Sequence, residues 1–152
     1  MKPIQNKELP EAIIKIWQRK GKHLCLKVEG HSMFPYFQKD DVVELYLDEI
    51  NIHALKTGDI IAFLQDQMII VHRYIKKKKW NNQWKVCQRG DHLSGFRWIN
   101  SQQIIGRAIA IHRNGRRIDL LYYHQILLNR FLGYLGWIWI WGRKVHITRL
   151  SE

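Results

Sequence analysis

The chain has 152 residues, of which 46% are hydrophobic and 25% are charged. This length and composition exclude a disordered chain and are sufficient for one folded domain with a real core. The net charge of +12 indicates attraction to phosphates, either of nucleic acid or of anionic lipid headgroups, and a solvated basic surface is the alternative. The two cysteines, Cys25 and Cys87, provide neither a disulfide framework nor a four-ligand zinc site. We expect them to be buried or free, or paired if the strands that hold them are adjacent, and we expect no metal and no cofactor.

The N-terminus does not have the pattern of a signal peptide. Its apolar part, AIIKIW at residues 12–17, is short and contains a lysine. No window reaches the ~18 to 20 apolar residues that a membrane-spanning helix requires. We therefore expect a cytoplasmic protein or one that binds a membrane peripherally.

The predicted elements are mainly short strands, with helices only at the two ends of the chain. Residues 9–19 have the apolar spacing of an amphipathic helix that ends before Gly21. A long hairpin is predicted at residues 67–91, with the lysine run at 76–79 in its loop, and Asn114-Gly115 predicts the turn of another hairpin. Many short strands separated by turns predict an all-β, antiparallel fold.

A polar turn, Gly30-His31-Ser32-Met33, separates two predicted strands and is followed by Pro35. The turn favours display of the Ser32 side chain, because glycine lets the backbone bend and proline stiffens the exit. A serine becomes a nucleophile when a base takes its proton and donors stabilise the oxyanion. The alternative is that Ser32 only bonds the backbone of its own turn.

A histidine and an aspartate are the candidates for activating this serine. His72 lies within the apolar strand MIIVHRYI, where it is either a neutral general base or a satisfied buried histidine. Asp91 follows Gly90 at the end of the partner strand and is placed to orient an imidazole. The alternative for Asp91 is a turn aspartate that bonds its own backbone.

Six motifs then occur in one order between about residues 28 and 119: Gly-x-Ser-Met-x-Pro, Asp-Asp-Val-Val, Thr-Gly-Asp-Ile-Ile-Ala-Phe, Ile-Val-His-Arg, Arg-Gly-Asp and Ile-Ile-Gly-Arg-Ala. This ordered set resembles the signal-peptidase-like serine peptidases, a superfamily that includes the LexA-type self-cleaving repressors. The resemblance implies coiled antiparallel sheets, with Ser32 as nucleophile. It places His72 where other branches have a lysine base, makes Asp91 the third catalytic candidate, and gives Asp59 a turn-shaping role.

We expect an N-terminal helical segment (1–22), a peptidase domain of the resembled type (23–122) and a Trp-rich C-terminal segment (123–152). The resemblance implies a serine endopeptidase that removes a leader or signal-like segment from a peptide or protein by Ser-His or Ser-His-Asp catalysis. The alternatives are a basic nucleic-acid-binding β-barrel and an inactive homologue that binds peptides. The ordered motifs make nucleic acid the less favoured partner.

The C-terminal segment contains the sequence Trp137-Ile-Trp139-Ile-Trp141, with basic residues on both sides of it. Amphipathic rings next to basic residues favour contact with an anionic membrane surface, here through residues 126–145. The same residues also fit an element that packs on the core, or a strand with its tryptophans on one face.

Overall fold

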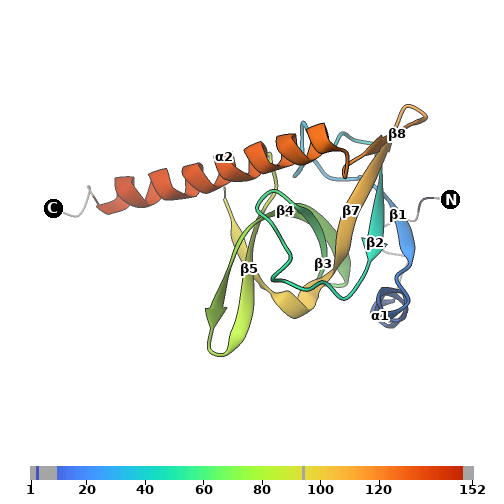
Figure 1. Ribbon diagram of the computed structural model, residues 1–152, viewed down its shortest axis with the longest axis horizontal. Helices are drawn as coiled ribbons and strands as arrows, with labels where there is room; N and C mark the ends of the chain where they lie inside the picture. Colours follow the sequence, from blue (N-terminus) through green and yellow to red (C-terminus); the bar gives the residue numbers. More distant parts are fainter. Residues whose placement is uncertain (1–2, 4–9, 94, 149–152) are drawn as a thin grey trace.

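The computed structural model describes residue 3, residues 10–93 and residues 95–148. The predicted all-β fold is confirmed: one antiparallel sheet curls into a half-barrel, with a helix near each end of the chain (Figure 1). The helices are α1 (Glu11–Arg19) and α2 (Tyr123–Thr148), with a 3-10 turn, η1, at Ser101–Gln103. The strands are β1 (His23–Lys27), β2 (Val42–Leu47), β3 (Ile60–Gln65), β4 (Met68–Trp80), β5 (Gln83–Arg89), β6 (Arg97–Asn100), β7 (Ile104–Arg113) and β8 (Arg116–Asp119).

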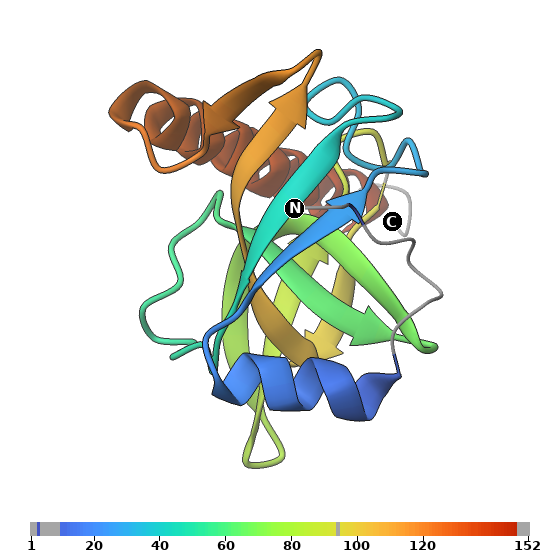
Figure 2. The ribbon, with the colours of Figure 1, turned by 90° about the vertical axis from the view of Figure 1, so that its right-hand side faces the viewer.

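The sheet has the order β1-β2-β7-β3-β4-β5-β6, and β8 pairs with β7. Strand β7 therefore joins the two halves of the sheet, pairing with β2 on one side and β3 on the other. Figure 2 shows α1 across one end of the curled sheet and α2 at the opposite end. Leu24 and Leu45 are fully buried in one core cluster and Ile61 and Phe63 in a second, so apolar burial in both clusters stabilises the fold.

The two predicted hairpins have different outcomes. The Asn114-Gly115 turn is confirmed, with both residues at positive φ (50° and 74°). The prediction of a lysine-rich loop was wrong: β4 continues through the lysine run to Trp80, and the turn is made by Asn81 and Asn82, again at positive φ. A projecting two-stranded ribbon is solvated at its tip, so its strand residues there need no apolar alternation.

Helix α2 rests on the turn before β3. A Cβ added to Gly58, which has a φ of 97°, would lie 2.1 Å from the Asn129 carbonyl oxygen, and one on Gly133 would lie 2.6 Å from the Gly58 nitrogen. Asp59 accepts a hydrogen bond from the Lys56 backbone N–H (2.9 Å), so Asp59 shapes this turn. The backbone of the helix therefore approaches the turn as closely as only glycines permit.

The C-terminal segment is a helix and not a strand. Among the described residues no helix is long and apolar enough to cross a membrane. The side chains of Trp137, Trp139 and Trp141 lie outside the part of the chain that the structure describes. Cys25 and Cys87 are free, buried cysteines on separate strands.

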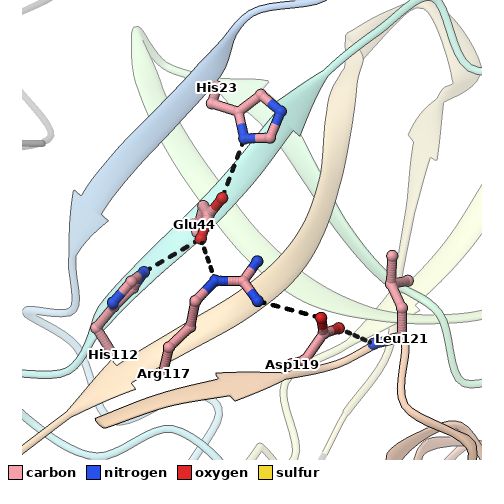
Figure 3. Close-up of polar contacts among 6 residues, drawn as sticks. All are labelled: His23, Glu44, His112, Arg117, Asp119 and Leu121. Atoms are coloured by element: carbon pink, nitrogen blue, oxygen red, sulfur yellow. Dashed lines mark hydrogen bonds and ion pairs between the residues drawn. The ribbon is translucent and has the colours of Figure 1, made fainter.

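One carboxylate joins four neighbouring strands on the outside of the sheet (Figure 3). Glu44 on β2 accepts hydrogen bonds from His23 Nδ1 on β1 (3.0 Å), His112 Nε2 on β7 (3.1 Å) and Arg117 Nε on β8 (2.9 Å). Burial acts to raise the pKa of Glu44, but these hydrogen bonds outweigh it and lower the pKa to about 2. The ionised carboxylate thus stabilises this edge of the half-barrel.

We predict that Glu44→Gln lowers the free energy of unfolding by about 1 to 2 kcal/mol at pH 7, allowing for solvent screening. Because the folded pKa lies below that of the unfolded chain, the contribution is complete above the unfolded pKa and is lost as pH falls toward 2. Urea unfolding at pH 7 and at pH 3 should therefore show a smaller difference between variant and wild type at pH 3. Glu29→Gln, at an exposed position, is the control, and a pH-independent effect of Glu44→Gln would contradict the account.

Candidate active site

The serine turn joins β1 to β2 and is held by the core from below. Met33 and Phe37 are 3% and 2% exposed and belong to the main core cluster. Their burial fixes the turn on both sides of its apex while Ser32 remains partly exposed. The turn therefore displays the serine hydroxyl, as its sequence predicted.

A buried ion pair closes the same turn. Asp41 is 2% exposed and accepts hydrogen bonds from Arg113 Nε (2.8 Å) and Nη2 (2.6 Å) and from the Gln38 backbone N–H (2.8 Å). Arg113 Nη2 also donates to the Tyr36 carbonyl (2.9 Å). Such a bidentate pair fixes orientation as well as position, so strand β7 clamps the exit of the turn.

The structure brings Ser32 and His72 together. The Nε2 atom of His72, on β4, lies 2.9 Å from Ser32 Oγ. His72 is 8% exposed, and its ring meets Phe63 edge to face with centroids 5.9 Å apart. The imidazole is therefore fixed by packing, with one nitrogen directed at the serine hydroxyl.

The other ring nitrogen of His72 meets Gln88, a residue that the sequence analysis missed. Gln88 Oε1 on β5 lies 2.6 Å from His72 Nδ1, and Gln88 is 2% exposed. An amide oxygen only accepts hydrogen bonds, so Nδ1 carries the proton and the Nε2 lone pair faces Ser32. The sequence signal for this residue was a glutamine at an inward-facing position of a strand.

Burial is the main influence on the protonation of His72, and it lowers the pKa of the imidazole. The hydrogen bond to Gln88 and the more distant charge of Asp91 act to raise that pKa, but the net shift is downward. A lowered pKa keeps the ring neutral at physiological pH. The pair therefore has a free base next to a hydroxyl.

Asp91 binds Arg73 and not His72, which was its expected partner. It accepts from Arg73 Nε (2.8 Å) and Nη2 (2.6 Å), and the position at His72 Nδ1 is taken by Gln88. Successive residues of a strand point to opposite faces, and Asp91 lies on the face of Arg73 rather than that of His72. The arrangement at the site is Ser-His-Gln, with Asp91 behind it.

The segment that holds Asp91 nevertheless supports the serine turn. A Cβ on Gly90 would lie 2.5 Å from the Ser32 carbonyl oxygen, and the His92 backbone N–H donates to that same oxygen (2.9 Å). Gly90 is therefore required by a close backbone approach. The end of β5 fixes both the backbone of Ser32 and, through Gln88, the ring of His72.

Two small cavities meet at His72. One, of about 330 Å³, is lined by Ser32 and His72 together with apolar side chains that include Met33 and Val43. The second, of about 370 Å³, is lined by His72, Gln88 and more polar groups such as Arg97. A larger cavity, of about 810 Å³, contacts neither Ser32 nor His72 and lies against α2. The two small cavities give a ligand access to both sides of the Ser-His pair.

A serine hydroxyl bonded to a neutral, buried imidazole on a curled antiparallel sheet defines a serine-peptidase-like site. The model of the Peptidase S24-like family matches residues 2–85, which is more than half of the chain and includes Ser32 and His72. The chain belongs to the Peptidase S24-like family. No curated protein matched the chain. Membership suggests a serine peptidase fold and leaves the catalytic residues and the substrate to be argued from this site.

We predict that Asp91→Ala lowers the free energy of unfolding by about 3 kcal/mol, because it leaves the guanidinium of Arg73, which is 1% exposed, without its ion-pair partner. Urea unfolding measures the change. Asp66→Ala, in an exposed turn, is the control and should change stability by less than about 0.5 kcal/mol. A loss of activity with unchanged stability would instead make Asp91 a member of the catalytic site.

Proposed function

We propose that the protein is a serine endopeptidase that removes a leader or signal-like segment from a peptide or protein. The observation that carries the proposal is the 2.9 Å separation of Ser32 Oγ and His72 Nε2. This distance allows direct proton transfer in the tautomer set by Gln88. No rearrangement is needed to activate the serine.

In the proposed reaction Ser32 Oγ attacks the scissile carbonyl as its proton moves to His72 Nε2. The imidazolium then gives this proton to the leaving amine, and the acyl-enzyme is released by a water that His72 deprotonates in the same way. Backbone N–H groups of the serine turn are the candidates for stabilising the oxyanion. The firm anchoring of the turn by Met33 and Phe37 favours this role, since oxyanion donors act best when preorganised.

Gln88 is a positioning residue in this mechanism. Its amide oxygen holds the imidazole in the Nδ1–H tautomer and accepts from the imidazolium, but it carries no charge. A glutamine therefore stabilises the charged intermediate less than the aspartate of a Ser-His-Asp triad would. With an uncharged glutamine at Nδ1, the imidazole also remains neutral to a lower pH than it would beside an aspartate.

The substrate is an extended segment with a modest apolar side chain next to the cut. The cavity of about 330 Å³ beside Ser32 is lined between residues 26–30 and residues 69–72, at the two sides of the serine turn. The sheet order ends at β1, and β5 pairs with β4 only from Arg73 onward. An extended peptide lying between these strands would add to the sheet and present its carbonyl to Ser32.

We predict that Ser32→Ala abolishes, and His72→Ala reduces by ~10³-fold or more, both cleavage of a synthetic peptide mixture and labelling by a fluorophosphonate probe. Mass spectrometry detects the cuts and in-gel fluorescence the label. His31→Ala, at the exposed neighbouring position, should retain both activities. Because Ser32 lies at a partly exposed apex, its alanine variant is expected to fold normally, which thermal unfolding checks.

Cleavage that persists in His72→Ala would contradict the role of the imidazole. Peptide binding without cleavage or labelling by the wild type would make the chain an inactive, peptide-binding member of its family. Salt-sensitive binding of RNA or DNA without peptidase activity would support the nucleic-acid-binding alternative instead.

The pH dependence of activity tests the contact between Gln88 and His72. Activity requires neutral His72, so the acidic limb of kcat/KM falls below the ordinary histidine pKa of 6.5 in the wild type. Gln88→Glu places a carboxylate against the ring, which raises the pKa of His72 and moves this limb upward by about one pH unit or more. Gln125→Glu, outside the site, is the control, and an unmoved limb in Gln88→Glu would contradict the assigned contact.

A further inference from the structure

The cavity on the Gln88 side of His72 differs in charge from the apolar cavity beside Ser32. It has a volume of about 370 Å³ and is lined in part by apolar side chains of β3 and β4. Among the residues that the structure describes, its lining contains two arginines, Arg89 and Arg97, and no Asp or Glu. We call it the basic cavity. Its position next to the reactive pair means that a substrate bound at Ser32 also passes this cavity.

Strand pairing places the side chain of Arg97 on the face of the sheet that carries the reactive imidazole. Arg97 is the first residue of β6 and lies directly opposite Gln88 of β5 in the antiparallel register. Residues directly opposite each other in such a pair point to the same face, with Cβ atoms ~4.5 to 5.5 Å apart. Because Gln88 Oε1 lies 2.6 Å from His72 Nδ1, Arg97 lies next to the side chain that contacts the base. The charge of Arg97 accordingly acts to lower the pKa of His72.

Arg97 is exposed and has no carboxylate partner in the part of the chain that the structure describes. Four other arginines are each paired with an aspartate or a glutamate: Arg73, Arg113, Arg117 and Arg130. Asp91, the acidic residue nearest to Arg97 in the sequence, is bound by two nitrogens of Arg73. The guanidinium of Arg97 is therefore available to an anionic group of a ligand in the basic cavity.

The rim of the basic cavity is tied to the serine turn. The His92 backbone N–H donates to the Ser32 carbonyl (2.9 Å), and Arg89 Nε donates to the Leu93 carbonyl (3.0 Å). The segment between β5 and β6 is thus fixed to the nucleophile at one end, and Arg97 enters the pairing of β6 with β5 at the other. A cation held in this way is preorganised relative to the reactive pair, which lowers the cost of binding a substrate.

We propose that the basic cavity is a subsite for an aspartate or glutamate side chain of the substrate, and that Arg97 selects it. The inference rests on the proposed peptidase function and names the substrate class of that site: a segment with an apolar and an acidic residue flanking the cut. An extended chain advances about 3.3 Å per residue, so a side chain in a cavity that contacts His72 belongs to a residue within about three positions of the cut. The planar guanidinium of an arginine matches a carboxylate with two parallel hydrogen bonds.

The test begins with cleavage of a peptide library at pH 8, where cut sites are read by mass spectrometry. One cut sequence is then synthesised with Glu, Gln or Lys at the acidic position. We expect the wild type to cleave the Glu peptide with a kcat/KM about threefold or more above that for the Gln peptide, and rising salt should reduce this ratio. Each ratio compares two peptides on one enzyme. Because burial lowers the pKa of His72, the ring is neutral at pH 8 and its titration does not affect the comparison.

Variants of Arg97 assign the preference to this side chain. In Arg97→Gln the ratio of kcat/KM for the Glu and Gln peptides should fall to about one. In Arg97→Glu the preference should reverse, so that the Lys peptide is cleaved faster than the Glu peptide. Arg116→Glu makes the same change of net charge at an exposed position on β8 and should keep the wild-type ratios. Thermal unfolding checks that each variant is folded.

Equal cleavage of the Glu and Gln peptides by a wild type that the fluorophosphonate probe labels would overturn the subsite and leave the proposed peptidase intact. Arg97 would then serve only as a charge that protects the edge strand β6. Equal changes in Arg97→Glu and Arg116→Glu would also overturn it, in favour of attraction by net charge.

A wild type that neither cleaves peptides nor reacts with the probe would contradict the proposed function, and peptide binding would then test the subsite. On an array of peptides in matched Glu and Gln pairs, the wild type should bind the Glu members more tightly, and Arg97→Gln should lose this difference. Equal binding of the paired peptides by the wild type would overturn the subsite.

Discussion

The hydrogen bond between Ser32 Oγ and His72 Nε2, 2.9 Å long, is the contact on which the account of this protein depends. It joins a turn between β1 and β2 to a residue of β4 that lies 40 residues further along the chain, at the base of the β4–β5 hairpin. Neither side of the contact is held locally. The turn is fixed by core burial of Met33 and by the Asp41–Arg113 pair, and the imidazole by Gln88 on the neighbouring strand. Positioning of this kind is what converts a weak nucleophile into a reactive one.

A second buried group ties the site to the C-terminal helix. Arg73 follows His72 on β4 and points to the other face, where its guanidinium binds Asp91, the Gly58 carbonyl (3.0 Å) and Asn129 Oδ1 of α2 (2.9 Å). Consecutive residues of one strand thus serve the reactive pair and the helix support. Helix α2 is therefore anchored through the strand that carries His72.

Much of this arrangement could be predicted from residue pattern. Strand alternation and the Asn114-Gly115 turn gave the antiparallel β fold, and ordered motifs singled out Ser32 and His72. The partners of those residues could not be predicted, because they depend on register between strands. Asp91 and Gln88 both lie near the end of β5, and only the pairing of β4 with β5 decides which of them faces His72. The lysine run was misassigned to a loop because charge alone does not distinguish a solvated ribbon from a turn.

The most direct test of the central contact is the protonation of His72, measured by nitrogen-15 NMR of the imidazole at neutral pH. The account predicts a neutral ring protonated at Nδ1, with an Nε2 resonance that shifts when Ser32 is replaced by alanine. A ring protonated at Nε2, or an imidazolium at neutral pH, would contradict it, because neither form has a lone pair on Nε2 to accept the serine proton.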